Sequence, residues 1–82
     1  MWYVYILKSV IKKWYYIGST SRLEERIIEH NTGKTLSTKG YKPFILIFSK
    51  QFEIETEARK YERMLKDKRT EKERIIKLFE KN

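Results

Sequence analysis

Side chains that can transfer protons or hold a phosphate gather early in the chain. Two tyrosine-rich stretches, residues 2–7 and 14–18, precede an arginine and the only histidine of the sequence. Arg26 and His30 are four residues apart and therefore share one face of a helix. A phenol becomes a general base only if a neighbouring cation lowers its pKa from about 10, and an arginine can hold phosphate through two parallel donors. These residue types favour acid–base chemistry in a cleft between that helix and the tyrosine-rich strands.

Each of these residues also has a purely structural interpretation. The tyrosines can be packed aromatic residues of a small sheet. Arg26 can form an exposed ion pair with Glu29, which contributes little to stability. His30 can interact with the C-terminal end of its helix.

Several other motifs are incomplete. Residues 33–35 (GKT) lack the earlier glycine of a phosphate-binding loop. One histidine and no cysteine cannot build a closed structural zinc site, and the absence of cysteine fits a reducing compartment. No apolar run approaches the length of a membrane span, so we expect a cytoplasmic protein without membrane contact.

The charge balance indicates a polyanionic partner. The 82 residues include 19 Lys and Arg against 11 Asp and Glu, a formal net charge of +8. The excess is segregated, because residues 32–50 contain four lysines and no acidic residue. Such a distribution is typical of a surface that follows a nucleic-acid backbone, although a solubility charge would give the same total.

The elements that must position these residues can be read from hydrophobic patterns. Alternation over Trp2–Lys8 predicts a strand, and a second strand ending at Gly18 should pair with it as a hairpin. Residues 44–49 (FILIFS) follow Pro43 as a continuous apolar run, which predicts the central strand, covered on both faces. Residues 32–42 read as a polar, mobile loop. The resulting order, ββαβαα, predicts a small sheet with helices packed on it.

Three helices complete this pattern. The first should begin with a Ser21–Glu24 capping box and end at residues 31–33. Its apolar stripe comprises Leu23, Ile27 and Ile28. The second is expected from about residue 55 to 67, and a Thr70–Glu73 capping box should begin the third.

Five sequence elements, taken together and in order, resemble a known family. Tyr3-Val4-Tyr5 and Tyr16-Ile17-Gly18 resemble the two-part signature of GIY-YIG nucleases. Residues 23–31 (LEERIIEHN) resemble the family's helix, whose arginine falls on Arg26 and whose His-or-Tyr position falls on His30. Residues 57–66 (EARKYERMLK) resemble the helix that carries the metal-binding glutamate, here Glu62. The chain is most similar to small stand-alone bacterial members related to the N-terminal nuclease domain of the excision-repair endonuclease.

The resemblance implies a single domain over residues 1–82, an α+β fold with a three-stranded antiparallel sheet flanked by about three helices. It implies a metal-dependent DNA endonuclease that nicks phosphodiesters with little sequence specificity. Glu62 would hold a single divalent ion, Mg²⁺ or Mn²⁺, which suits a lone carboxylate, although by spacing alone Glu62 would pair with Lys66. The implied catalytic residues are Tyr5, Tyr16, Arg26 and His30, and which phenol is the base stays open.

Some positions depart from the family pattern. The first tripeptide lacks the leading glycine, Ser19 stands where the excision-repair relatives carry a lysine, and their downstream asparagine has no equivalent. The alternative prediction is therefore a nucleic-acid-binding module that keeps the fold without useful catalysis, with Tyr41 as an exposed aromatic contact. In either case we expect the backbone of DNA to contact Lys34, Lys39 and Lys42 together with the basic second and third helices. Specificity would come from DNA structure or from a protein partner.

Overall fold

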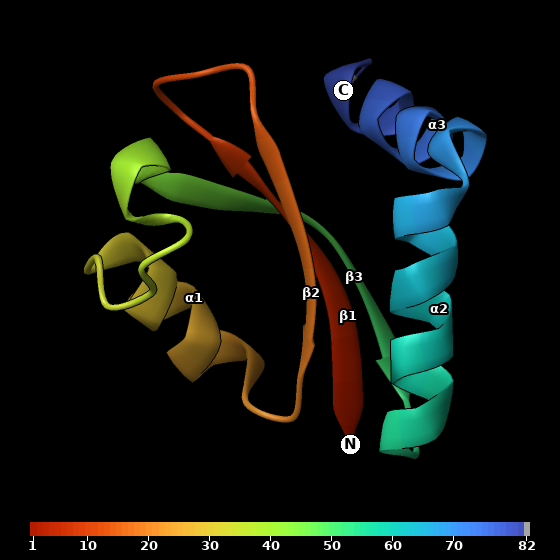
Figure 1. The fold of residues 1–82 in the computed structure, drawn as a ribbon. Helices are drawn as coiled ribbons and strands as arrows, with labels where there is room; N and C mark the ends of the chain where they lie inside the picture. Colours follow the sequence, from red (N-terminus) through yellow and green to blue (C-terminus); the bar gives the residue numbers. More distant parts are fainter. Residues whose placement is uncertain (82) are drawn as a thin grey trace.

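A computed structural model describes residues 1–81 of the chain. The elements follow the order β1 (Trp2–Ser9), β2 (Tyr15–Thr20), α1 (Leu23–Asn31), the short 3-10 helix η1 (Lys39–Tyr41), β3 (Phe44–Phe52), α2 (Glu55–Asp67) and α3 (Arg69–Glu80). The strands form one antiparallel sheet (Figure 1). The predicted α+β fold, its three strands and its ββαβαα order are confirmed.

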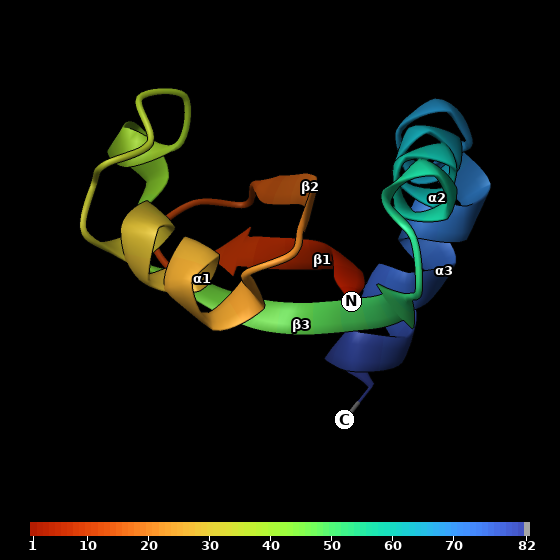
Figure 2. The ribbon, with the colours of Figure 1, turned by 90° about the horizontal axis from the view of Figure 1, so that it is seen from below.

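The sheet is the middle of three layers, with α1 on one face and α2 and α3 on the other (Figure 2). Successive side chains of a strand point to opposite faces, so β1 contributes to both interfaces. Tyr5 and Leu7 enter the cluster on the α1 side, whereas Val4 and Ile6 pack toward α2 and α3. All four side chains are essentially inaccessible to solvent. The two halves of the core are therefore separated by the sheet itself.

The prediction that residues 44–49 form the central strand is wrong. The strand order is β2-β1-β3, which places β1 in the centre and β3 at an edge. In β3 only Phe44 is buried, while Ile45 and Leu46 are 44% and 39% exposed. A continuous apolar run is compatible with double coverage but does not require it, and here the hairpin strand β1 is the one that receives helices on both sides.

The predicted capping box at the start of α1 does not form. The helix begins at Leu23, and no side chain accepts a hydrogen bond at its N-cap. Instead, the backbone N–H of Arg22 donates to Thr20 Oγ1 at 3.0 Å, which fixes the turn that leads from β2 into the helix. Ser21 stays exposed. A side-chain hydrogen bond one residue earlier has replaced the expected cap.

Two further helix predictions need correction. Because α3 begins at Arg69, Thr70 lies inside the first turn and forms no capping box with Glu73. Ile28 is 61% exposed, so the buried side of α1 includes Leu23 and Ile27 but not the third residue of the predicted stripe.

The connection between α1 and β3 is attached to the body of the protein at several points. Gly33 has φ of 80°, the left-handed conformation that commonly reverses the chain after a helix. Asn31 forms two hydrogen bonds with the backbone of Phe44, donating to its carbonyl oxygen at 3.2 Å and accepting from its N–H at 2.6 Å. Thr38 is completely buried. The composition predicted a polar loop, but one of its threonines belongs to the core.

Candidate active site

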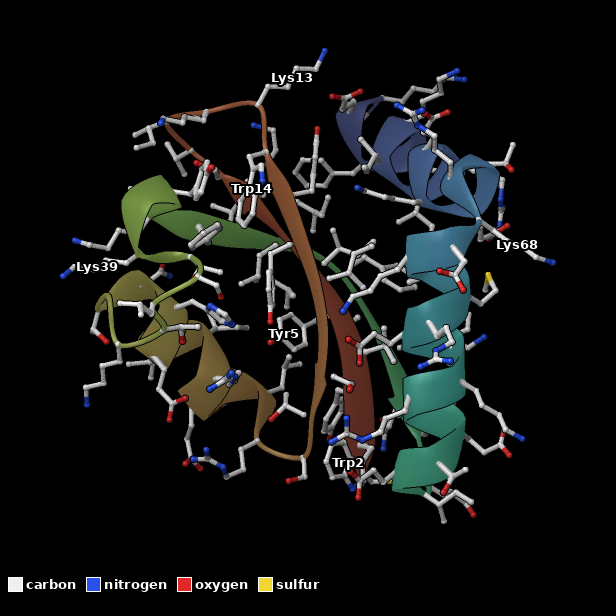
Figure 3. The ribbon with its side chains drawn as sticks, viewed as in Figure 1. Trp2, Tyr5, Lys13, Trp14, Lys39 and Lys68 are labelled. Carbon is white, nitrogen blue, oxygen red and sulfur yellow. The ribbon has the colours of Figure 1, made fainter. Side chains whose placement is uncertain are left out.

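Tyr5 and Gly18 form the centre of the site, and they are direct cross-strand partners in β1 and β2. A Cβ atom at Gly18 would lie 2.6 Å from the Tyr5 hydroxyl oxygen, 2.8 Å from Tyr5 Cζ and 2.9 Å from Tyr16 Cε2. The Tyr5 phenol therefore lies across bare backbone, on the face of the sheet that α1 covers (Figure 3). The glycine of the second tripeptide is needed because the tyrosine of the first occupies its side-chain space.

The buried phenol of Tyr5 is joined to α1 and to the loop by a chain of hydrogen bonds. Tyr5 Oη lies 3.1 Å from His30 Nε2, and His30 Nδ1 lies 2.8 Å from Thr38 Oγ1. The Thr38 hydroxyl donates to the carbonyl oxygen of Thr35 at 3.4 Å, so its oxygen is free to accept from His30 Nδ1–H. His30 Nε2 then accepts from the Tyr5 hydroxyl. His30, which is fully buried, thus orients the phenol.

The surroundings of this pair keep both groups neutral near pH 7. Burial and the neighbouring Tyr16 raise the pKa of Tyr5 to about 12, outweighing the opposite effect of Arg26. Burial, followed by the charge of Arg26, lowers the pKa of His30. In the nucleic-acid-free protein Tyr5 is therefore a hydrogen-bonding phenol and not a phenolate base.

Tyr16 is the more accessible of the two signature tyrosines. Its side chain is half-buried, and its ring centroid lies 4.9 Å from that of His30 and 6.2 Å from that of Tyr5. The three rings form one cluster in which Tyr5 is only 1% exposed. A water molecule at the surface can reach the Tyr16 side of this cluster more easily than the Tyr5 side.

Arg26 forms an ion pair on the surface of α1 and also lies beside the Tyr5 phenol. Its Nη1 lies 2.9 Å from Glu29 Oε1, so the helix-surface ion pair is present. The same guanidinium lies beside the Tyr5 phenol, whose pKa it lowers. The side chain is 34% exposed, which leaves donors of the planar fork available to a phosphate.

Glu62 reaches the site from the opposite layer. Its Oε1 accepts a hydrogen bond from Ser19 Oγ at 2.5 Å, and its Oε2 accepts one from Lys66 Nζ at 2.7 Å. The carboxylate side chain is 17% exposed. Partial burial raises its pKa, but the hydrogen bonds from Lys66 and Ser19 and the charge of Lys66 outweigh burial, so the net pKa is lowered. Glu62 is therefore ionised at neutral pH.

The two halves of the site meet around the edge strand β2. Gly18 and Ser19 are neighbours in this strand and point to opposite faces, the first toward Tyr5 and the second toward Glu62. The charge of Glu62 contributes, as the smallest of several causes, to the raised pKa of Tyr5. A carboxylate from α2 and a guanidinium from α1 thus flank one narrow strand edge.

The three loop lysines of the sequence prediction lie elsewhere. All three are exposed in the connection between α1 and β3, and Lys39 points away from the body of the protein (Figure 3). The basic residues beside Glu62 come from α2 instead. A hollow on this helix is lined by four basic residues and three carboxylates, namely Arg59, Lys60, Arg63, Lys66, Glu55, Glu62 and Asp67.

Sequence reasoning missed two polar residues of the site, Ser19 and Thr38. Ser19 is two residues beyond Ile17, which packs in the core on the α2 side, so strand alternation would have directed its hydroxyl toward that helix. No local signal distinguishes Thr38 from the other polar residues of its loop.

The comparison with protein families agrees with this geometry. Residues 1–75 match the family model described as the GIY-YIG catalytic domain. The match covers most of the chain and includes both tripeptides, Arg26, His30 and Glu62. The chain belongs to the GIY-YIG family.

Its relatives include small proteins of similar length. A UPF0213 protein of Staphylococcus haemolyticus is 40% identical over 63 residues, which cover 73% of this chain and 76% of the relative. A UPF0213 protein of Natronomonas pharaonis is 33% identical over 76 residues, covering 90% and 88% of the two chains. The solution NMR structure of a UPF0213 protein from Bacillus halodurans is 34% identical, with a TM-score of 0.57 over 95% of this chain and 85% of the other.

Among residues 1–81, no helix combines the length and the apolar character that crossing a bilayer requires.

Proposed function

We propose that the protein is a metal-dependent DNA endonuclease that nicks phosphodiester bonds at the edge of β2. The observation that carries the proposal is the meeting of the Tyr5–Tyr16–His30 cluster and Arg26 with the ionised Glu62 around Gly18 and Ser19. Membership of the GIY-YIG family supports a nucleic acid as the substrate. The formal charge of +8 supports binding to a phosphate backbone.

In this proposal the two tyrosines have different tasks. As the bond from water to phosphorus forms, Tyr16 accepts the proton of the water and releases its own phenolic proton to solvent, because it is the phenol nearer the surface. The bond from phosphorus to the leaving oxygen breaks in the same step, and solvent protonates that oxygen. Tyr5, held by His30, keeps the ring of Tyr16 in place and stays protonated. Arg26 neutralises a non-bridging phosphate oxygen as negative charge develops there.

Glu62 is the residue that would hold a divalent ion. Its carboxylate is ionised and is the metal ligand that the family resemblance assigns; among residues 1–81, no group of three or more His, Cys, Asp or Glu side chains could hold a metal. A lone carboxylate fits Mg²⁺ or Mn²⁺ as a single ion, because Mg²⁺ keeps several waters and takes further ligands from the substrate phosphate. The bound ion would supply additional positive charge to the reacting phosphate.

A second candidate function is nucleic-acid binding without cleavage. Both oxygens of Glu62 already accept hydrogen bonds, one from Ser19 and one from Lys66, and this occupancy favours the alternative. The basic residues of the hollow on α2 and the loop lysines Lys34, Lys39 and Lys42 would serve either function. We also propose a cytoplasmic location, supported by the absence of cysteine, and specificity supplied by DNA structure or a protein partner.

The test is time-dependent nicking of supercoiled plasmid by the purified protein. We expect nicking in Mg²⁺ or Mn²⁺, its loss in EDTA, and its loss in Glu62→Gln and Glu62→Ala. Glu57→Gln is the matched control, because it removes an exposed carboxylate from the same helix and should leave the rate unchanged. Folded protein that binds DNA but never cuts it across several metals would support the binding module instead.

A further inference from the structure

A second aromatic group lies next to the site and is not used by the proposed chemistry. Trp14 and Tyr41 are stacked with ring centroids 4.0 Å apart and an interplanar angle of 13°. The centroid of the Trp14 ring is 6.3 Å from that of Tyr16, with the two rings tilted by 33°, so the stacked pair adjoins the candidate catalytic phenol without stacking on it. The row of rings leads from the strand edge to η1.

The backbone around this stack is fixed before any ligand binds. Ser9 Oγ donates to the carbonyl oxygen of Tyr41 at 2.6 Å and accepts from the N–H of Lys12 at 3.2 Å. The N–H of Val10 donates to the carbonyl oxygen of Pro43 at 2.9 Å. The turn of the hairpin and the residues around η1 are thereby held together, so the rings keep their spacing at little entropic cost.

Tyr41, expected from the sequence to be exposed, is partly buried against the cluster on the α1 side, but an exposed lysine still reaches its ring. Trp14 covers one face of the ring, and the ammonium of Lys12 lies 5.2 Å from its centroid. Lys12 is exposed and its ammonium stays hydrated, so the part of the ring that it overlies is at the surface. A planar group could replace the ammonium there and extend the stack.

The charge around the stack favours an anionic ligand. Residues 1–23, which include the hairpin, and residues 30–52, which include η1, contain no aspartate or glutamate. Lys12 and Lys13 are exposed in the hairpin turn, from which Lys13 projects outward (Figure 3), and Lys39 and Lys42 are exposed in the connection that contains Tyr41. Aromatic faces bordered by lysines are how proteins bind single-stranded nucleic acid, with bases on the rings and phosphates on the cations.

We propose that the Trp14–Tyr41 stack and Lys12 bind an unpaired base of the DNA substrate. The base stacks on Tyr41, and Lys12 moves from the ring to the adjoining phosphate. This inference rests on the proposed function. It defines the substrate as DNA that has single-stranded nucleotides next to the phosphodiester bond cleaved at Tyr16. A base inside a duplex cannot stack on the ring, because both of its faces are already covered by neighbouring base pairs; only the two end pairs of a blunt duplex leave a face uncovered.

The test measures the fluorescence of Trp14 in the presence of EDTA, so that DNA binding is observed without cleavage. A failure of the base-binding inference can then be told apart from a failure of the proposed nuclease activity. In Trp2→Phe protein, Trp14 is the only tryptophan. We expect a single-stranded oligonucleotide to change its fluorescence and a blunt duplex to change it much less. Trp14→Phe protein, which reports through Trp2 on the α2 side of the sheet, should respond equally to both DNAs.

A variant of Tyr41 tests the contact itself. Tyr41→Leu keeps an apolar side chain against Trp14 but removes the ring, and should weaken single-strand binding by roughly 5- to 100-fold. Binding of duplex should change much less, and circular dichroism verifies the fold of the variant. Equal responses of Trp14 to single strand and duplex, or unchanged affinity in Tyr41→Leu, would overturn the inference.

Discussion

Replacing Gly18 by alanine should damage the site by a predictable amount. The new methyl group would lie 2.6 Å from the Tyr5 hydroxyl oxygen and 2.9 Å from a ring carbon of Tyr16, both far inside van der Waals contact. Tyr5 cannot move freely, because it is buried and bonded to His30. The Tyr5 ring must shift or the strands must separate locally.

The magnitude follows from two opposing effects. Overpacking of a core costs about 1–3 kcal/mol, whereas replacing glycine by alanine can return about 0.4–1 kcal/mol by restricting the unfolded chain. Because Tyr5 is buried and hydrogen-bonded, the cost should fall in the upper half of its range, about 2–3 kcal/mol, which leaves a net loss of about 1–2.5 kcal/mol. Such a loss should lower the thermal midpoint of this small domain by roughly 4–20 °C. Nicking should fall with it, because both tyrosines are displaced.

Thermal and denaturant unfolding followed by circular dichroism measure this loss. Gly40→Ala is the control, because a Cβ atom there meets nothing within 4 Å and the change should stay within about 0.5 kcal/mol. Added to Gly18→Ala, Tyr5→Phe removes the nearest contact, with Tyr5 Cζ still 2.8 Å from the methyl, but it also removes the hydrogen bond to His30. It should therefore cost less stability in the Gly18→Ala protein than in the parent protein. A Gly18→Ala protein as stable and active as the parent would refute the packing argument.

Three other predictions address the neighbouring groups. The pKa of Tyr5 is raised to about 12 in the folded protein, so the folded protein holds this proton more tightly than the unfolded chain does. The free energy of unfolding, measured in urea, should therefore fall as pH rises from about 10 to 12, and it should fall less steeply in Tyr5→Phe. Lys66→Met frees one oxygen of Glu62, so Mn²⁺ should bind roughly 2- to 5-fold more tightly, as measured by calorimetry. Lys60→Met removes the same charge from the helix and should change the Mn²⁺ affinity less. Asn31→Ala removes two hydrogen bonds to the start of β3 and should cost about 1–3 kcal/mol of unfolding free energy, measured by urea unfolding.

Local patterns were sufficient to predict the elements that carry the site. Alternation identified β1, the apolar run identified β3, and the spacing of Arg26 and His30 correctly placed them on one helix. These features depend on residues that are near one another in sequence, where strand and helix periodicity apply directly. The family resemblance supplied Glu62, whose spacing alone indicated the pair with Lys66 that the structure also contains.

The remaining features depend on contacts between distant residues. Whether β1 or β3 is central is decided by where the helices pack, and both strands are apolar enough for either place. The contact of Tyr5 with Gly18 follows from the hairpin register, and the burial of Thr38 follows from its bond to His30. Local spacing predicts a capping box at Ser21, but the helix begins at Leu23, so Ser21 is not its N-cap, and the side-chain bond at this turn joins Thr20 to the N–H of Arg22.

The central claim is that side chains from opposite layers act on one phosphate. A cycle of single-turnover nicking rates for Tyr16→Phe, Glu62→Gln and the double variant tests it most directly. Residues that act together are non-additive, so we predict that each single variant loses about 100-fold or more and that the double variant is about as slow as the slower single one. Losses that multiply, or a Tyr16→Phe protein that cuts at the parent rate, would contradict a shared site at the edge of β2.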